Sequence, residues 1–226
     1  MTALVQIDVT EAWRRLHADD VSPTAFVLAC VGRAVAAHPE VHAYRDWLGR
    51  LVMHRHVDIT AMIEVGTESG VYPLAHPIRD TDIRTVSDIS DELRRIKTTP
   101  ARGGSGKLLV RWGRIAGSIP GLVSLVYWAA LRSPLVRSWI GTVTVTSVGM
   151  SLGGGGFAIG VPTVSSLSVA VGGVSERPWV VDGAVEVRQI MDLTALVDHR
   201  VVDGAPAARF GATLRVMLED PDRVDW

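Results

Sequence analysis

The C-terminal part of the chain alternates apolar runs with turn residues, a pattern typical of β-strands. The runs are TVTVTSVGM (142–150), SLGGGGFAIGVP (151–162), SSLSVAVGGV (165–174) and MDLTALVD (191–198). Asp182-Gly183 stands between apolar residues and is the strongest short hairpin signal in the sequence. A final amphipathic helix is expected from about Ala205 to Leu218, with Ala208, Phe210 or Gly211, Leu214 and Leu218 facing inward.

The N-terminal part mixes strand and helix signals. Leu4 to Val9 alternates as a half-buried strand does, and Thr10 is expected to cap a short helix after it. A longer helix should begin at Ser22 or Pro23 and stop before Pro39. Two β-rich stretches, 50–65 and 71–78, precede an amphipathic helix from Val86 to Ile96 that Thr85 or Ser87 would cap.

The middle of the chain differs from both flanks. ARGGSGK (101–107) has the composition of a linker, and Leu108 to Ile140 is rich in tryptophan and small residues. Its most apolar part, 115–131, is just long enough to span a bilayer, but Pro120 and Gly121 interrupt it. A buried or interface helix is therefore favoured over a membrane-surface helix, and a transmembrane helix is the least favoured of the three.

Composition narrows the class of protein. The 226 residues suit one domain, and 23 basic against 24 acidic residues give a net charge of −1, so no nucleic-acid partner is expected. The start of the chain has no signal-peptide pattern, which favours the cytoplasm. Cys30 is the only cysteine, so an internal disulfide is excluded, and Lys97 and Lys107 are the only lysines that could carry a covalent cofactor.

Two glycine-containing motifs are candidates for chemistry. Gly149-Met150-Ser151-Leu152-Gly153 has the form G-x-S-x-G, and Asp182 or Asp192 followed by His199 would complete a hydrolase order. A glycine run after Ser151 cannot start a helix, so a serine hydrolase is disfavoured. No lysine follows the run 153–156, so a close-packed backbone segment between strands is favoured over a phosphate cradle.

Histidines supply two further candidates. His54 and His56 could be metal ligands, but an ordinary strand with one polar face is favoured and no metal is expected. His17, His38, His42 and His76 are interpreted as surface or turn residues. In DHRVVDG (198–204), His199 follows an apolar strand and could act as a general base; from spacing alone, a salt-bridged turn is an equal alternative.

The motif DHRVVDGAPAARF (198–210) resembles the active-site signature of the acyltransferases of 2-oxo acid dehydrogenase complexes, which share their fold with chloramphenicol acetyltransferase. HPEVHAYRD, MHRHVDITAMIEV, HPIRDTD, GTVTVTSVGM and VGGVSERPWVVDG follow in the family's order, so the resemblance covers about 5–98 and 141–224. It implies an α/β (α+β) fold in which helices flank a mixed β-sheet, here as a single domain of residues 1–226. Residues 101–140 would form a linker and an apolar helical insertion within it.

The resemblance also implies acyl transfer with coenzyme A as substrate and no metal. His199 would be the general base, and Thr146 would stabilise the oxyanion. Asp203 would hold the histidine loop through an ion pair, and Ser147, Gly149 and Arg200 would contact coenzyme A. The site would lie between subunits of a homotrimer, with the histidine from one subunit and the hydroxyl from its neighbour. Such trimers could assemble further.

The chain departs from the family pattern in three respects. First, this sequence has no counterpart of the family's first helix and strand, which carry an arginine that could pair with Asp203. Second, residues 108–140 are inserted. Third, no lipoyl or peripheral-subunit-binding domain is found. We therefore expect a free-standing acyltransferase whose acceptor is a lipoyl group on another protein or a small alcohol, amine or thiol. A non-catalytic scaffold protein of the same fold is the alternative.

Overall fold

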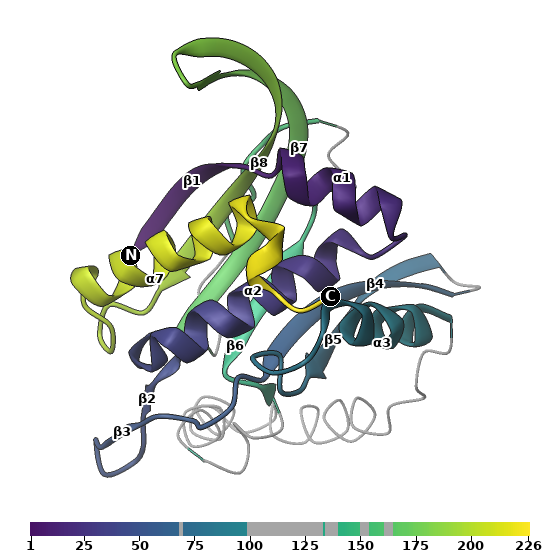
Figure 1. Cartoon of the computed structure of the whole chain (residues 1–226). Helices are drawn as coiled ribbons and strands as arrows, with labels where there is room; N and C mark the ends of the chain where they lie inside the picture. The colour runs from purple at the N-terminus through teal and green to yellow at the C-terminus, as the bar shows by residue number, and fades with distance from the viewer. Residues whose placement is uncertain (68–69, 99–132, 134–139, 150–153, 161–164) are drawn as a thin grey trace.

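The computed structural model describes residues 1–67, 70–98, 133, 140–149, 154–160 and 165–226 (Figure 1). Its strands are β1 (Thr2–Asp8), β2 (Tyr44–Arg45), β3 (Leu51–Val52), β4 (Ile59–Thr67), β5 (Gly70–Ile78), β6 (Val143–Ser147), β7 (Leu167–Val181) and β8 (Ala184–Val197). Its helices are α1 (Thr10–Ala18), α2 (Pro23–Ala37), α3 (Val86–Thr98) and α7 (Gly204–Glu219), with short 3-10 turns at Pro39–His42 and Pro221–Arg223.

Six of the strands form one mixed sheet, as the sequence predicted. Their order is β1-β8-β7-β6-β4-β5. β6 lies parallel to both β4 and β7, and the remaining neighbours are antiparallel. β2 and β3 pair separately. β6 is therefore an interior strand, held on both edges by hydrogen bonds, and this fixes the residues that it carries.

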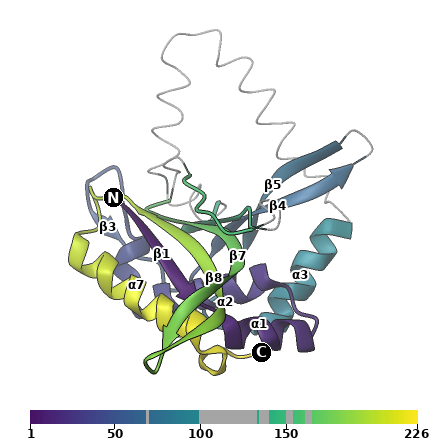
Figure 2. The same ribbon diagram turned by 90° about the horizontal axis from the view of Figure 1, so that it is seen from above.

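The described helices lie on one face of the sheet (Figure 2). α2 is the most buried of them, because Ala25 to Gly32 are all shielded from solvent. It begins at Pro23 in the first turn and ends before Pro39, as predicted. β-strand side chains alternate between faces, so Val143, Val145 and the residues in register with them form the core beneath these helices.

The helix caps follow the sequence in one case and not in another. Thr85 caps α3, because its hydroxyl accepts a hydrogen bond from the Asp88 amide at 3.1 Å. The expectation for Thr10 is wrong: Val9 occupies the cap position of α1. The Thr10 hydroxyl instead donates to Asp8 Oδ1 at 2.6 Å and accepts from the Gln189 amide at 2.9 Å, which ties α1 to β8.

The predicted hairpin at Asp182-Gly183 is confirmed, with positive φ angles of 49° and 84° at its two central residues. β8 then continues unbroken to Val197, so MDLTALVD is the second half of a 14-residue strand and not a further strand. The outer parts of β7 and β8 extend past the sheet as a curved ribbon (Figure 1). Val180, Val185 and Val187 on this ribbon are exposed.

Four local expectations are corrected by tertiary contacts. Residues 154–160 of the predicted run 151–162 form no strand, and His54 and His56 lie in the loop between β3 and β4. Ala208 on α7 is exposed, whereas Phe210, Leu214 and Leu218 are buried. His42 is buried, with 1% exposure, and its Nδ1 lies 3.0 Å from Thr142 Oγ1.

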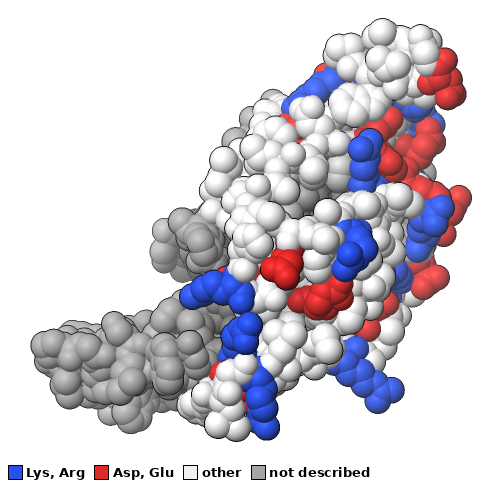
Figure 3. Space-filling view, turned by 90° about the vertical axis from the view of Figure 1, so that its left-hand side faces the viewer, with Lys and Arg blue, Asp and Glu red and all other residues white. Residues whose placement is uncertain are grey.

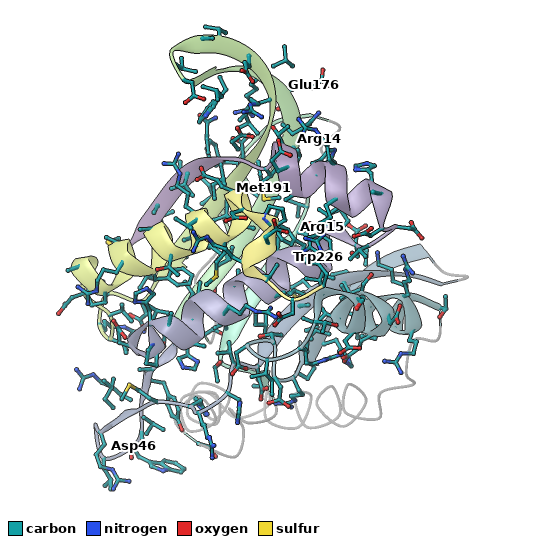
Figure 4. The ribbon with its side chains drawn as sticks, in the orientation of Figure 1. Arg14, Arg15, Asp46, Glu176, Met191 and Trp226 are labelled. Carbon is teal, nitrogen blue, oxygen red and sulfur yellow. The ribbon has the colours of Figure 1, made fainter. Side chains whose placement is uncertain are left out.

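The C-terminal residue packs on the helix layer. The Trp226 ring stacks on Phe26 with ring centroids 5.7 Å apart, and the Arg15 guanidinium lies 4.1 Å from the centroid of the Trp226 ring (Figure 4).

Basic and acidic side chains are interspersed on the face of the molecule in Figure 3. The predicted apolar helix within 108–140 and the hydrolase candidate Ser151 lie outside the described residues, and no described helix is long and apolar enough to cross a membrane.

Candidate active site

The histidine motif forms a tight loop between β8 and α7. The Asp198 amide donates to the Ser166 carbonyl at 2.8 Å, which continues the β7–β8 pairing beyond Val197. The Asp198 carbonyl then accepts from the amides of Val201 and Val202, both at 3.0 Å. These bonds fold the backbone around His199 without any contribution from the side chains of α7.

His199 is oriented by a bond within its own loop. Its Nδ1 lies 3.1 Å from the carbonyl oxygen of Val202. A carbonyl oxygen can only accept, so in the neutral ring Nδ1 carries the proton and Nε2 carries the free lone pair. No hydrogen bond to Nε2 is formed by the part of the chain that the structure describes, and the side chain is exposed. His199 is therefore arranged as a base toward solvent or a ligand.

Arg200 is held by the first residue of the motif. Its Nε and Nη2 lie 3.0 and 2.8 Å from the two carboxylate oxygens of Asp198, and its amide donates to the same carboxylate. These bonds hold the pKa of Asp198 below its usual range. His199 and Arg200 line a cavity of about 290 Å³ together with Ser165, Ser168 and the first two residues of the chain.

Asp203 occupies the cap position of α7, where its carbonyl accepts from the Ala207 amide at 3.2 Å. Its side chain is exposed, and within the described ranges no basic group forms an ion pair with it. The ion pair that the resemblance implies for Asp203 therefore stays a prediction.

Thr146 and Ser147 end β6 and face opposite sides of the sheet. Thr146 is half-buried on the face away from the helices. Ser147 faces the helices and lines a cavity of about 390 Å³ with Gly149, Trp13 and Met191, the last of which is labelled in Figure 4. Gly149 presses against β7: a Cβ there would lie 2.0 Å from the Gly172 carbonyl oxygen, so only glycine is accommodated.

The register separates His199 from Thr146. A row of register partners runs across β6, β7 and β8 and consists of Val143, Leu167 and Val197. Thr146 lies three residues from this row toward one end of the strands. His199 lies two residues from it toward the opposite end. At about 3.3 Å per residue, the two lie roughly 15 Å apart along the strands and about 10 Å apart across them. General-base catalysis needs contacts of about 3 Å. One chain therefore does not bring both residues to the same reacting atoms.

The hydrolase and phosphate-cradle alternatives lose support in the described residues. Asp192 is bound by Arg177, Gln6 and the Gly156 amide and does not contact His199, and Asp182 lies in the hairpin turn. Because the Gly156 amide already bonds a carboxylate, it is not free for a phosphate. The interpretation of the glycine run as close-packed backbone is confirmed at Gly154 to Gly156, which pack on β7. No group of three metal-ligating side chains is found in the described ranges.

The C-terminal part of this arrangement matches a known protein family. The family model for the catalytic domain of 2-oxoacid dehydrogenase acyltransferases matches residues 139–224, which contain β6, β7, β8, the His199 loop and α7. The likeness to this acyltransferase family is thus shown over residues 139–224. The family resemblance read from the DHRVVDG motif is thus confirmed.

Two curated relatives show how far the likeness extends along the chain. The succinyltransferase component of the 2-oxoglutarate dehydrogenase complex of Escherichia coli K12 is 27% identical over 95% of this chain and 44% of its own length. The lipoamide acyltransferase component of the branched-chain α-keto acid dehydrogenase complex of Pseudomonas putida is 46% identical over 35% of this chain and 19% of its own. The chain thus spans less than half the length of these relatives.

Solved structures confirm the expected fold. The cubic core of the pyruvate dehydrogenase multienzyme complex has a TM-score of 0.72 at 19% identity, covering 99% of this chain and 82% of that one. Dihydrolipoamide acetyltransferase of Azotobacter vinelandii, studied for a serine, a histidine and an asparagine in its mechanism, has 0.71 at 21% identity, covering 99% and 82%. Chloramphenicol acetyltransferase has 0.60 at 16% identity, covering 96% and 87%.

Sequence reasoning missed the roles of two aspartates in the candidate site and its surroundings. Asp198 organises the loop, and its signal was available: an aspartate two residues before Arg200 can accept the Arg200 amide in an Asx turn. Asp192 binds Arg177 across β7 and β8. No local sequence pattern predicts this contact, because only the strand register brings the two residues together.

Proposed function

We propose that the chain is an acyl-coenzyme A-dependent acyltransferase whose active site is completed by a second copy of the chain. The observation that carries this proposal is the orientation of His199, whose Nδ1 bond to Val202 leaves Nε2 free as a base beside a cavity. The match of residues 139–224 to the acyltransferase catalytic domain suggests the class of reaction.

The proposed reaction moves an acyl group between two sulfur atoms. His199 Nε2 takes the proton from the acceptor thiol, and the resulting thiolate attacks the thioester carbon of acyl-coenzyme A. The negative charge that develops on the carbonyl oxygen is stabilised by the Thr146 hydroxyl. The tetrahedral intermediate then collapses, coenzyme A leaves as its thiolate, and the imidazolium returns its proton to that sulfur. No acyl-enzyme is formed.

The register argues for shared sites. Because Thr146 lies well away from His199 within one chain, the hydroxyl that meets His199 must come from a neighbouring copy. A closed ring of copies in which each gives its histidine to one neighbour and its threonine to the other satisfies every site. We propose a homotrimer, in accord with the fold shared with the cubic core of the pyruvate dehydrogenase complex.

The proposed substrates follow from the residues that line the two cavities. Arg200 lies at the His199 cavity, and Ser147 and Gly149 lie at the other, so coenzyme A would extend across the junction of two copies. The acceptor is proposed to be a dihydrolipoyl thiol, as the name of the Pseudomonas putida relative suggests. The lipoyl group is proposed to be presented from outside residues 1–226, whose only lysines are Lys97 and Lys107. A small hydroxyl or amine acceptor is the alternative.

The test is the release of free coenzyme A from acetyl-, isobutyryl- and succinyl-coenzyme A with dihydrolipoamide as acceptor. Wild type should turn over at least one of them, and His199→Ala should lower the rate by about a hundredfold or more, since general-base catalysis contributes on the order of 10²–10⁴. Equal rates for wild type and His199→Ala contradict the proposal. No turnover with any of these donors would favour the non-catalytic scaffold.

A further inference from the structure

The proposed reaction leaves two features of the sequence unused, and the structure joins them. One is the glycine run, of which the structure describes Gly154 to Gly156, and the other is the carboxylate of Asp192. Asp192 Oδ2 accepts from the Gly156 amide at 2.7 Å, and Oδ1 accepts from Gln6 Nε2 at 3.1 Å and from Arg177 Nη1 at 3.0 Å. Arg177 Nη2 donates to Oδ2 as well. A single carboxylate thus links β1, β7, β8 and the glycine run.

This carboxylate is charged and withdrawn from water. Asp192 is 1% exposed. Burial alone would raise the pKa of Asp192, but the hydrogen bonds from Arg177, Gln6 and the Gly156 amide outweigh it and lower that pKa. A buried, ionised carboxylate with four donors holds those donors in a fixed geometry. Its removal would leave the guanidinium of Arg177 without this partner.

The glycine run is pressed against an irregularity in β7. The β7–β8 register shifts between Val171 and Val174, and Gly172 and Gly173 form the irregularity. The Gly173 amide donates to the Gly156 carbonyl at 3.0 Å. A Cβ on Gly173 would lie 1.7 Å from the Gly154 carbonyl oxygen. Backbone therefore contacts backbone, and no side chain can act as a spacer.

These contacts form part of the wall of the larger cavity. Gly149, Gly154 and Gly172 line it, next to Ser147. The Asp192 carboxylate touches none of the atoms proposed to react. It lies on the same sheet face as Thr146, because Thr146, Ala170 and Thr194 are register partners and Asp192 precedes Thr194 by two residues on β8.

We propose that Asp192 is a positioning residue for acyl-coenzyme A: through Gly156 it holds the glycine run against β7 and so fixes the cavity wall at Gly149 and Gly154. The inference rests on the function proposed above, because Ser147 and Gly149 are the coenzyme A contacts of that proposal. It assigns Asp192 to substrate binding and leaves the proton transfer to His199.

Asp192→Asn tests the inference, because the amide keeps the shape of the side chain and removes its charge. In folded variant protein, the KM for acyl-coenzyme A should rise about tenfold or more while kcat stays within about threefold, since misplaced binding groups weaken uniform binding. Arg177→Lys, which keeps the charge but loses the paired bonds, should give a smaller rise. Ile89→Val on α3, a core change remote from the cavity, should lower stability and leave KM unchanged.

A KM for Asp192→Asn within twofold of wild type overturns the inference. Equilibrium titration with coenzyme A separates this failure from failure of the proposed function. If wild type binds coenzyme A but transfers no acyl group, the function fails, and weaker coenzyme A binding by Asp192→Asn would still support the positioning role. If Asp192→Asn does not fold, Arg177→Lys decides: an unchanged KM and an unchanged coenzyme A affinity contradict the role.

Discussion

His199 Nδ1 and the carbonyl oxygen of Val202 lie 3.1 Å apart, so the loop that carries the base also fixes its tautomer. In many hydrolases a separate carboxylate orients the histidine. Here the backbone of the same loop performs that task, and the loop is tied to β7 through Asp198 and Ser166. The orientation of the base therefore depends on the shape of the loop.

Asp198 should matter for rate although it does not contact the imidazole. In Asp198→Ala, the bonds to the Arg200 amide and guanidinium are lost, and the loop that orients His199 loosens. We expect kcat to fall by about tenfold to a hundredfold, in line with the cost of small misplacements of catalytic groups. Steady-state kinetics measure this.

Asp88→Ala is the matched control for that experiment. It removes an exposed carboxylate from the first turn of α3, away from the His199 loop. It should leave kcat within twofold of wild type. A kcat for Asp198→Ala within twofold of wild type would show that the loop holds its shape through backbone bonds alone.

His42 should make the fold sensitive to mild acid. Burial, followed by the nearby His54, lowers the pKa of His42 from 6.5 to about 4. The unfolded chain therefore takes up a proton more readily than the folded one, so this contribution to stability is complete above pH 6.5 and is lost as the pH falls toward 4. The midpoint of thermal unfolding should drop between pH 7.5 and 5.

His42→Gln should reduce that drop, because glutamine does not titrate. His17→Gln is the control, since His17 is exposed on α1. Differential scanning fluorimetry at a series of pH values gives the comparison. If wild type and His42→Gln lose stability in parallel from pH 7.5 to 5, His42 is not the group responsible.

Two buried threonines should respond to the same substitution with opposite signs. Thr194 Oγ1 is buried and has no hydrogen-bond partner in the described part of the chain, whereas Thr10 Oγ1 bonds both Asp8 and Gln189. Thr194→Val removes an unsatisfied hydroxyl and should raise the midpoint of thermal unfolding, while Thr10→Val should lower it. Each change should be a few degrees, since about 1 kcal/mol corresponds to roughly 2–4 °C at this size. A fall for Thr194→Val would indicate a partner for that hydroxyl, such as a water or a second copy.

Local patterns predicted the elements that local interactions decide. Pro23 and Pro39 bound α2, Thr85 caps α3, and Asp182-Gly183 turns the hairpin, because each acts within a few residues of its own position. The DHRVVDG motif likewise led to the His199 loop.

The features that could not be predicted depend on contacts between residues that are far apart in the sequence. His42 contacts Thr142, which lies a hundred residues away in the sequence, and Asp192 pairs with Arg177 across the strand register. The exposure of Ala208 reflects which side of α7 meets the sheet, and helical spacing leaves that choice open between adjacent residues. The separation of His199 from Thr146 follows from the order and register of the strands, and a local motif carries no information about either.

Mixed assembly tests the shared site most directly. His199→Ala and Thr146→Ala chains, each inactive alone, are unfolded together in equal amounts and refolded, and acyl transfer is then measured. If each site takes its histidine from one chain and its hydroxyl from a neighbour, random mixing should restore about one quarter of the wild-type rate, because that fraction of interfaces combines both intact residues. Activity that stays at the level of the separate variants, while refolded wild type regains full activity, would contradict the shared site.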